Sequence, residues 1–523
     1  MMSSCVYIKL LFILFVIFYA ESFNNDKKCA ARPYFNKSVV CVCNATYCDE
    51  VTREEIACGQ YIWYTSSKAG KRFEKYVSSL QYFPPSVEYQ YSTLELDLNT
   101  RYQTVEGFGG AVTDAVGINW LNLTNPQLKQ HFINSYFSDK GLQYSMMRVP
   151  IGGSDFSTHV YAYNEYPEND VKLSNFSLTY EDYTYKIPFI KAASAVAKTP
   201  IHIVSSTWSP PKWMKNTHKF LGISRLKEEF FQTYADYHKK FIEKYEEEGI
   251  PIWGITTTNE PLDGAAMPPK FNCLGWTVQT FGQWIKDNLG PTIKNWKPEV
   301  NILAVDDQRL AIPLWFDAVV DWNPGSLKYV DGIAVHSYMN KYIPPDILTR
   351  TQELYKNQFI LTTEFCEGAM PWQQPKVDLG SWDRAVTYIL NILEDLNYNL
   401  IGWIDWNLCL NSEGGPNWVQ NFVDSPVIVF PERGEFVKQP MFYAMGHFSK
   451  FIPRGSIRIQ VKELSNATIN NVAFITPYNT VVVVLYNDKS VNRLIRLKLG
   501  IKQASVLVEA DSVTTVEIPN GCG

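Results

Sequence analysis

Two glutamates in this sequence stand where acetal hydrolysis would need them. Glu260 follows Asn259 at the end of the apolar run 252–261. Glu364 lies in a second run of the same kind, residues 359–368. Cleavage of a glycosidic bond needs one carboxyl group that protonates the departing oxygen and another that meets the positive charge developing at the anomeric carbon. The pair therefore predicts a glycosidase with Glu260 as acid/base and Glu364 as nucleophile.

The neighbouring residues decide this interpretation, because either glutamate alone would more often be a surface or capping carboxylate. Arg148, at the end of another apolar run, is expected to hold Glu364 ionised. Asn259 is expected to hydrogen-bond the 2-hydroxyl of the sugar. His336 either supports the site or is a satisfied structural histidine.

Other motifs point away from alternative chemistries. The acidic pair Asp306 and Asp307 is expected to be structural, as loop carboxylates or in a salt bridge to Arg309. The segment Gly107-Phe-Gly-Gly110 lacks the third glycine of a dinucleotide-binding loop and predicts a tight turn. No metalloprotease, nucleotide-binding or serine-hydrolase motif occurs, so we expect neither a cofactor nor a metal.

A repeated pattern in the middle of the chain predicts the elements that hold these residues. Short β-rich apolar runs alternate with longer helical stretches, such as 226–247, 276–288 and 382–396. The eight runs are 104–112, 144–153, 201–208, 252–261, 301–309, 330–338, 359–368 and 399–408. Eight strand–helix units predict a (β/α)8 barrel of the α/β class, with a doubly wound sheet as the rival. In such a barrel the active site lies at the carboxyl ends of the strands, where both glutamates stand.

The C-terminal part has a different pattern. Alternating polar and apolar residues occupy five short runs: 457–461, 472–476, 481–486, 494–499 and 505–509. Such runs, separated by turn residues, predict a β-sandwich. The strand-like segment before the barrel, residues 54–98, is expected to complete it.

The composition of the chain excludes several classes of protein. Of the 523 residues 46% are hydrophobic, which excludes global disorder. Aromatic residues reach 14%, an excess that fits core filling and also stacking on sugar rings. The net charge of −5 and the lack of a Lys/Arg run exclude nucleic-acid binding.

The N-terminus predicts entry into the secretory pathway. Lys9 precedes the apolar run 10–20, so residues 1–20 are interpreted as a signal peptide; a membrane anchor is the alternative, but the run is short for a bilayer. Five glycosylation sequons agree with this route, at Asn36, Asn44, Asn122, Asn175 and Asn466.

The ten cysteines are interpreted in the same setting. Cys5 leaves with the signal peptide, and no histidine lies near the N-terminal cluster, which favours disulfides over zinc. The preferred pairs are Cys29 with Cys41 and Cys43 with Cys48. Cys58 and Cys522 either form a third pair or stay free, and three scattered cysteines are interpreted as buried thiols: Cys273, Cys366 and Cys409.

Longer runs resemble the glucosylceramidases of glycoside hydrolase family 30 over nearly the whole mature chain. The runs that carry the resemblance are Cys41-Val-Cys-Asn-Ala-Thr-Tyr-Cys48, Gly107-Phe-Gly-Gly110, Arg148-Val-Pro150, Asn259-Glu-Pro261, Asp306-Asp-Gln-Arg309, Gly332-Ile-Ala-Val-His336, Gly380-Ser-Trp-Asp-Arg384, Asp405-Trp-Asn407, Glu413-Gly-Gly-Pro-Asn-Trp418 and Gly446-His-Phe-Ser-Lys-Phe-Ile-Pro453.

The resemblance implies hydrolysis of glucosylceramide to glucose and ceramide with retention, through Glu260 and Glu364. It implies glucose contacts from Asp155, Trp208, Asn259, Trp406 and Asn421, with Tyr338 beside the two glutamates. It also implies a lysosomal or secreted protein, a glycolipid substrate at an anionic phospholipid surface, and a saposin-type activator. By analogy, residues 25–52 and 411–439 would form a three-stranded disulfide-bearing sheet, 54–98 and 456–523 the sandwich, and 101–408 with 441–455 the barrel.

Some positions depart from the family pattern. Ser337 stands where vertebrate members have Trp, Pro269 replaces an aromatic residue, Gln420 replaces Arg, and Cys29 is shifted relative to the usual first cysteine. These positions are expected at the pocket mouth or surface, where they bear on aglycone preference more than on the chemistry. Trp372 is interpreted either as an exposed aromatic that enters a lipid interface or as a residue packed under its own loop.

Overall fold

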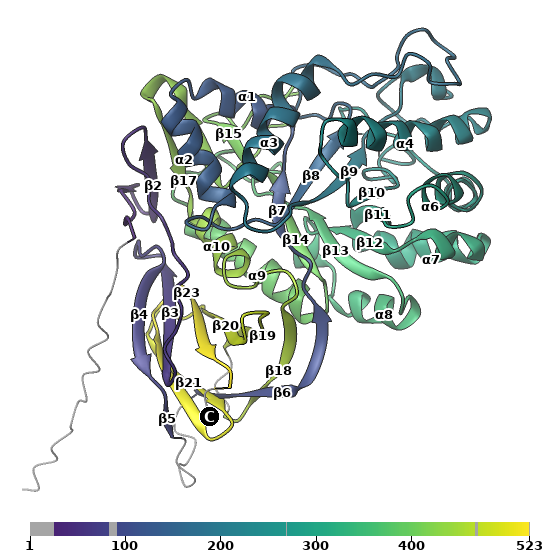
Figure 1. The fold of residues 1–523 in the computed structure, drawn as a ribbon. Coiled ribbons are helices and arrows are strands. Elements are labelled where there is room, and N and C mark those ends of the chain that lie inside the picture. The colour runs from purple at the N-terminus through teal and green to yellow at the C-terminus, as the bar shows by residue number, and fades with distance from the viewer. Residues whose placement is uncertain (1–25, 83–91, 268, 466–468, 522–523) are drawn as a thin grey trace, which may run out of the picture.

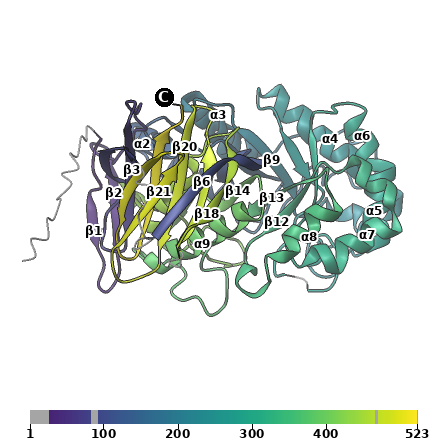
Figure 2. The same ribbon diagram turned by 90° about the horizontal axis from the view of Figure 1, so that it is seen from below.

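The computed structural model describes residues 26–82, 92–267, 269–465 and 469–521. They form a barrel, a large β-sandwich and a small mixed sheet. Figure 1 shows the sandwich below the barrel, and Figure 2 shows the two side by side. The predicted signal peptide, residues 1–20, lies outside the described residues, as do Asn466 and Cys522. Within the described ranges no helix has the length and apolar character that a membrane crossing requires.

Eight parallel strands close into a barrel, as predicted. The strand order is β10-β11-β12-β13-β14-β7-β8-β9, and closure excludes the doubly wound alternative. Each strand lies within one of the eight predicted runs: β7 (Gly107–Ala111), β8 (Met146–Ile151), β9 (His202–Thr207), β10 (Gly254–Thr256), β11 (Asn301–Gln308), β12 (Gly332–His336), β13 (Phe359–Glu364) and β14 (Gly402–Asn407).

Helices surround the barrel (Figure 1). In α4, Tyr234, Tyr237, Phe241 and Tyr245 recur at helical spacing and are fully buried, which fixes the side that meets the strands. The predicted stretches 226–247 and 276–288 contain α4 and α5, and α9 extends one residue beyond the predicted stretch 382–396. The helices are α1 (Asp114–Asn122), α2 (Pro126–Phe137), α3 (Ile187–Val196), α4 (Phe231–Glu247), α5 (Val278–Trp284), α6 (Gly290–Lys294), α7 (Asp317–Trp322), α8 (Asp346–Leu354), α9 (Trp382–Asn397) and α10 (Pro440–Ser449).

The barrel interior changes from apolar to polar along the strands. One buried apolar cluster fills its lower part: Met146, Val204, Leu303, Ala334, Leu361 and Ile404. Side chains on a strand face the same side every second residue, so the next inward layer lies two positions further on. That layer consists of Arg148, Ser206, Thr256, Asp306, His336, Thr363 and Trp406. Asp306 lies three positions beyond Leu303 because β11 has a bulge at Val305. The alternation thus places a polar floor directly above a hydrophobic plug.

The sandwich combines an N-terminal segment with the C-terminal strands. Its hydrogen-bonded order is β4-β3-β23-β20-β19-β18-β6-β21-β22-β5, so strands far apart in the sequence are neighbours. The C-terminal runs correspond to β18 (Ile457–Glu463), β19 (Asn470–Ile475), β20 (Thr480–Asn487), β21 (Arg493–Leu499) and β22 (Lys502–Val508), and β23 (Ser512–Pro519) follows them. The N-terminal strands are β3 (Gln60–Ser67), β4 (Glu74–Ser79), β5 (Gln81–Tyr82) and β6 (Ser92–Thr104).

The small sheet has five strands, so the expectation of three was wrong. Its order is β1-β2-β17-β16-β15, from Ala31–Pro33, Val39–Asn44, Glu435–Lys438, Val427–Phe430 and Cys409–Asn411. The two outermost strands have three residues each, too short for a recognisable alternation of polar and apolar residues. In addition, β15 follows barrel strand β14 almost directly, and the sequence therefore offered no boundary between them.

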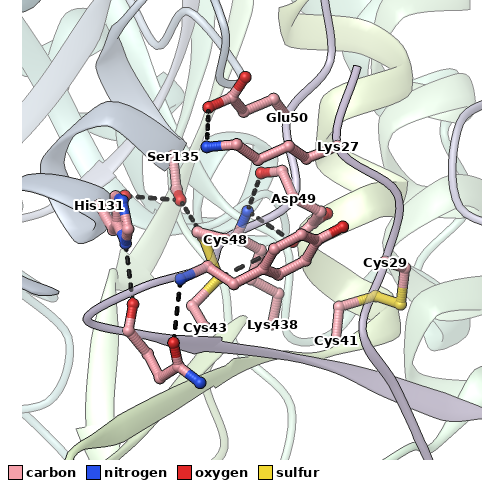
Figure 3. Close-up of a disulfide and its surroundings, with 12 residues drawn as sticks. Lys27, Cys29, Cys41, Cys43, Cys48, Asp49, Glu50, His131, Ser135 and Lys438 are labelled. Atoms are coloured by element: carbon pink, nitrogen blue, oxygen red, sulfur yellow. Dashed lines mark hydrogen bonds and ion pairs between the residues drawn. A yellow bond between two sulfur atoms is a disulfide. The ribbon is translucent and has the colours of Figure 1, made fainter. Parts of the chain in front are cut away.

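Two disulfides hold the N-terminal edge of this sheet. The pairs are Cys29–Cys41 and Cys43–Cys48, those preferred from the sequence. Figure 3 shows Asp49 and Lys438 beside the second bridge, where their side chains form an ion pair at 3.0 Å. Cys58 is also disulfide-bonded, while its candidate partner Cys522 lies outside the described residues. Three further cysteines are buried free thiols: Cys273, Cys366 and Cys409.

The sequons within the described residues lie on the surface. Asn36, Asn44, Asn122 and Asn175 are all exposed, so each is accessible to a glycosyltransferase.

Candidate active site

Backbone contacts at the rim of the barrel place the two glutamates. Glu364 is the last residue of β13, where it pairs with His336 of β12. Glu260 follows β10 with a left-handed backbone, φ 44°, and its N–H donates to the Asp306 carbonyl at 2.9 Å. A left-handed non-glycine residue is uncommon and costs energy, so the surrounding contacts must hold it. The turn directs the chain away from the strand just where Glu260 enters the cavity.

The two carboxyl groups lie in one cavity of about 700 Å³. One carboxylate oxygen of Glu260, one of Glu364 and a ring nitrogen of His336 lie within 4.8 Å of one another. All eight residues expected to act on or bind the substrate line this cavity: Asp155, Trp208, Asn259, Glu260, Tyr338, Glu364, Trp406 and Asn421. The site is therefore a single pocket with both glutamates at its inner end.

Two donors hold Glu364. Arg148 Nη1 donates to Oε2, and the Tyr338 hydroxyl donates to Oε1 at 2.7 Å. Burial raises the pKa of Glu364, the charges of His336 and Arg148 oppose the rise, and Glu260 adds to it, so the pKa lies above the usual glutamate value. Burial also raises the pKa of Tyr338, which keeps its phenol protonated as a donor. Both contacts favour a carboxylate over a carboxylic acid at this position.

Arg148 belongs to a buried network on the barrel floor. Its Nη2 donates to Asp306 Oδ2 at 2.8 Å and to Asn259 Oδ1 at 2.7 Å. Burial would raise the pKa of Asp306, but Arg148 and His336 hold it well below the usual range. Asp306 also accepts hydrogen bonds of 2.7 Å from the hydroxyl groups of Ser206, Thr256 and Thr363. Of the two structural alternatives for Asp306 and Asp307, the salt bridge to Arg309 is wrong: Arg309 instead pairs with Glu394.

His336 connects Glu260 to the buried network of Arg148 and Asp306. Its Nδ1 lies 3.1 Å from Glu260 Oε1 and its Nε2 lies 3.2 Å from Asp306 Oδ1. Burial would lower the pKa of His336, but the charge of Glu364 and the hydrogen bonds to Asp306 and Glu260 raise it to about 10. At neutral pH the ring is a cation that donates from both nitrogens, so it is not available as a metal ligand.

Glu260 lies near hydrogen-bond donors and also near further carboxyl groups. Burial would raise the pKa of Glu260, but the hydrogen bond and charge of His336, with help from Asp263 and Arg148, bring it below the usual value. Gln308 Nε2 lies 3.5 Å from Oε1. Two further carboxyl groups lie close by: burial and the charge of Glu260 raise the pKa of Asp263 to about 10 and that of Asp307 to about 7.

Aromatic and polar groups line the remainder of the inner pocket. The rings of Trp208 and Trp406 stack with centroids 5.3 Å apart, and the Arg148 guanidinium lies 4.9 Å and 5.5 Å from their centroids. Asp155 accepts hydrogen bonds from Asn417 at 3.0 Å and Asn421 at 3.1 Å. Burial raises the pKa of Asp155 to about 7, although the Asn421 amide opposes the rise. These groups provide flat apolar faces beside hydrogen-bonding edges, the combination that a pyranose needs.

The outer part of the pocket is apolar. Its lining includes Met267, Leu310, Leu314, Tyr342 and Met370. Met267 and Leu314 are each 71% exposed, and Trp372 in the adjoining pocket is 66% exposed, which excludes the packed alternative for this tryptophan. Exposed apolar side chains gathered around one opening are unusual in a soluble protein and indicate a contact surface.

Sequence reasoning missed several members of the site. Asp306 was assigned a structural role, yet it contacts both Arg148 and His336. The roles of Asp263 and Gln308 were not predicted, although both lie near carboxyl ends of barrel strands, which was the signal available. Ser337 is buried and donates to Asp395 at 3.2 Å, so it turns away from the cavity that the residue at this position was expected to border.

Among the described residues two clusters offer atoms suited to a metal, and neither supports one. Cys43 and Cys48 lie beside Asp49, but their sulfurs form a disulfide. Glu260, His336 and Glu364 also converge, but the raised pKa of His336 makes this ring a proton donor. The arrangement is instead a pair of carboxyl groups with different hydrogen-bond donors: Arg148 and Tyr338 for Glu364, and His336 for Glu260.

A closed barrel with a carboxylate pair at the carboxyl ends of its strands, next to a β-sandwich, defines a class of glycoside hydrolase. The chain belongs to glycoside hydrolase family 30: residues 105–452 match the TIM-barrel domain of that family and residues 455–516 match its β-sandwich domain.

Similar proteins span nearly the whole chain. The lysosomal acid glucosylceramidase of Mus musculus is 41% identical over 91% of this chain and 92% of its own length. The putative glucosylceramidase 3 of Caenorhabditis elegans is 39% identical over 93% of each chain. Among solved structures, an endo-β1,6-glucanase superposes with a TM-score of 0.78 at 25% identity, covering 89% of this chain and 100% of that one.

Proposed function

We propose that this glycoside hydrolase is a retaining β-glucosidase that hydrolyses glucosylceramide to glucose and ceramide. The observation that carries the proposal is the pair Glu260 and Glu364, whose oxygens approach within 4.8 Å at the inner end of a pocket with an apolar mouth. Retaining glycosidases hold their carboxyl groups about 5–5.5 Å apart, whereas inverting enzymes need about 6.5–9.5 Å to admit a water molecule. The short separation favours retention.

The two glutamates would then catalyse the reaction in two successive steps. Glu364, held by Arg148 and Tyr338, attacks the anomeric carbon while Glu260 gives its proton to the departing oxygen. The product is a covalent glucosyl-enzyme and a free alcohol. Glu260 next takes a proton from water, and the oxygen of that water displaces Glu364, which restores the enzyme and releases glucose with its original configuration.

The inner pocket would bind the glucose ring. Trp208 and Trp406 offer aromatic faces for stacking, and Asp155 with Asn421 offers polar atoms at the opposite edge. Asn259 has its Oδ1 engaged by Arg148, so its amide nitrogen is the group left to donate to the 2-hydroxyl. Such a bond strengthens as the oxocarbenium-like transition state develops.

The apolar mouth supports a lipid aglycone over a second sugar. Met267, Leu314 and Trp372 would contact the ceramide chains or the membrane surface from which the headgroup is drawn. An anionic phospholipid surface, a saposin-type activator and a lysosomal or secreted location are parts of the same proposal. Disulfides and exposed sequons support an oxidising, glycosylating route.

Active-site variants test the chemistry. Glu364→Gln should abolish turnover of an activated aryl β-glucoside, because the amide cannot act as the nucleophile. Glu260→Ala should be rescued on the same substrate by azide, which needs no general base to attack the glucosyl-enzyme and yields a β-glucosyl azide. Near-wild-type turnover in Glu364→Gln, or a product of inverted configuration, would refute the proposal.

A second candidate is a β-glycosidase for soluble β-linked glucans. The solved endo-β1,6-glucanase with the same fold favours it. Parallel assays on glucosylceramide in vesicles and on short β-glucan oligosaccharides separate the two candidates, since each predicts the higher kcat/KM for its own substrate.

A further inference from the structure

An additional carboxylic acid, Asp263, lies in the turn that carries Glu260. The Asp263 N–H donates to the Glu260 carbonyl at 3.0 Å, so the two residues stand one turn apart. Asp263 is half-buried and lines the same cavity as Glu260. The two acidic residues therefore belong to one turn and open into one cavity.

The two carboxyl groups hydrogen-bond one another. A carboxylate has only acceptors, so two carboxyl groups can form such a bond only when one of them carries a proton. The hydrogen bond between the two groups therefore implies a shared proton, as in other pairs of close carboxyl groups. It is present where the proposed reaction needs an acid.

Other charged groups face the pair from neighbouring strands. Asp307 of β11 lies on the same side and raises the pKa of Asp263, whereas the charge of His336 of β12 lowers it. The Cys273 thiol, whose own pKa burial raises to about 11, also lies within electrostatic range of Asp263. Burial and the negative charge of Glu260 outweigh the histidine, and the pKa of Asp263 rises to about 10.

We propose that Asp263 is a positioning residue for the acid/base group, holding in a shared hydrogen bond the proton that Glu260 delivers to the departing oxygen. The inference rests on the proposed function of Glu260. In the resting pair the proton lies on Asp263 and Glu260 is ionised. When the glucosyl bond breaks, the shared proton passes from Asp263 to Glu260, and Glu260 delivers it to the aglycone oxygen, which leaves both carboxyl groups ionised. Deprotonation of water by Glu260 in the second step returns a proton to the pair, so the cycle balances.

The consequence is that Glu260 and Asp263 titrate as a unit. Interacting acids lose their protons in steps that belong to the pair, and the last proton of this pair leaves at a higher pH than a lone glutamate would allow. The high-pH limb of kcat/KM reports the loss of the essential acid. Removing Asp263 should therefore move that limb to lower pH.

The test is Asp263→Asn, which keeps the size of the side chain and loses the shared proton. With a poor leaving group, such as an alkyl β-glucoside, the high-pH limb of kcat/KM should move down by at least one pH unit. With 2,4-dinitrophenyl β-glucoside, which leaves without protonation, kcat/KM should change less than threefold. Asp263→Glu should restore part of the shift, because a carboxyl group is again present.

Matched controls separate this role from a structural one. Asp287→Asn changes an exposed aspartate beside Lys286 and should leave both profiles unchanged. An Asp263→Asn profile that superimposes on wild type, or equal losses on both substrates without a pH shift, would overturn the proposal while leaving the proposed function intact. A wild-type protein without β-glucosidase activity, or full activity in Glu260→Gln, would instead overturn the proposed function.

Discussion

Arg148 and Asp306 form an ion pair 2.8 Å long at the centre of the barrel, and solvent reaches neither side chain. The pair lies directly above the apolar plug, so water cannot replace either partner. Asp306 balances the guanidinium charge, which lets Arg148 bond to Glu364 with its other nitrogen. The stability of the fold and the charge of the proposed nucleophile thus depend on the same contact.

Loss of Asp306 should therefore destabilise the protein strongly. In Asp306→Ala the buried Arg148 and His336 lose their shared anion, and we expect the free energy of unfolding to fall by about 3–5 kcal/mol. Urea denaturation measures the change. Glu248→Ala removes the partly exposed partner of the exposed Lys191 and should cost less than about 1 kcal/mol. Similar losses in the two variants would contradict the special role of the buried pair.

Tyr338→Phe should alter the pH dependence of catalysis. The phenol donates to Glu364 at 2.7 Å and lowers the pKa of that carboxyl group, which burial raises. Without this donor the pKa of Glu364 rises further, so the low-pH limb of kcat/KM should move to higher pH. The lost bond to a charged group corresponds to about 1.5–3 kcal/mol, or roughly a 10- to 150-fold fall in kcat/KM. An unchanged low-pH limb would show that the hydroxyl does not act on the nucleophile.

The barrel could be predicted from the sequence because each strand lies in a short, β-rich apolar run that a longer helical stretch follows. Residues 144–153 and 359–368 show this most clearly, and both contain the strands found. The small sheet was harder, since β1 and β15 have only three residues each and the sheet draws its strands from segments far apart in the chain. Pairings of this kind depend on tertiary contacts that no local pattern records.

The residues that line the pocket could be predicted as far as they lie at the carboxyl ends of the barrel strands. All eight lining residues expected from strand ends and from family resemblance converge. The function of Asp306 was not predictable, because the bulge at Val305 turns this aspartate inward and Asp307 towards Glu260. A sequence shows two adjacent acids, but only the backbone shows which of them faces the arginine.

His336 should make stability fall with rising pH. Its pKa is raised from 6.5 in the unfolded chain to about 10 in the folded protein, so the folded state binds the proton more tightly. The contribution is full below pH 6.5 and is lost as the pH rises through 10, with a slope of at most about 1.4 kcal/mol per pH unit. The stability difference between wild type and His336→Gln should therefore shrink between pH 7 and 10.

A second buried histidine gives the control for this measurement. Burial lowers the pKa of His238 to about 4, so this ring is neutral in both states above pH 7.5. The difference between wild type and His238→Gln should stay constant over the same range. A parallel pH response of the two variants in urea denaturation would mean that His336 is not a buried cation.

The apolar mouth should matter for a lipid substrate and not for a soluble one. Leu314 is 71% exposed and Trp372 66% exposed beside the opening, and contact of such a side chain with a membrane gains about 1.5–3 kcal/mol. Leu314→Glu should lower both vesicle binding and kcat/KM on vesicle-bound glucosylceramide by about tenfold or more, with an aryl β-glucoside hydrolysed as by wild type. Leu507→Glu alters an apolar residue of the sandwich, 49% exposed and remote from the mouth, and should change neither activity. Equal losses of Leu314→Glu on both substrates would place the effect in the pocket rather than at the membrane.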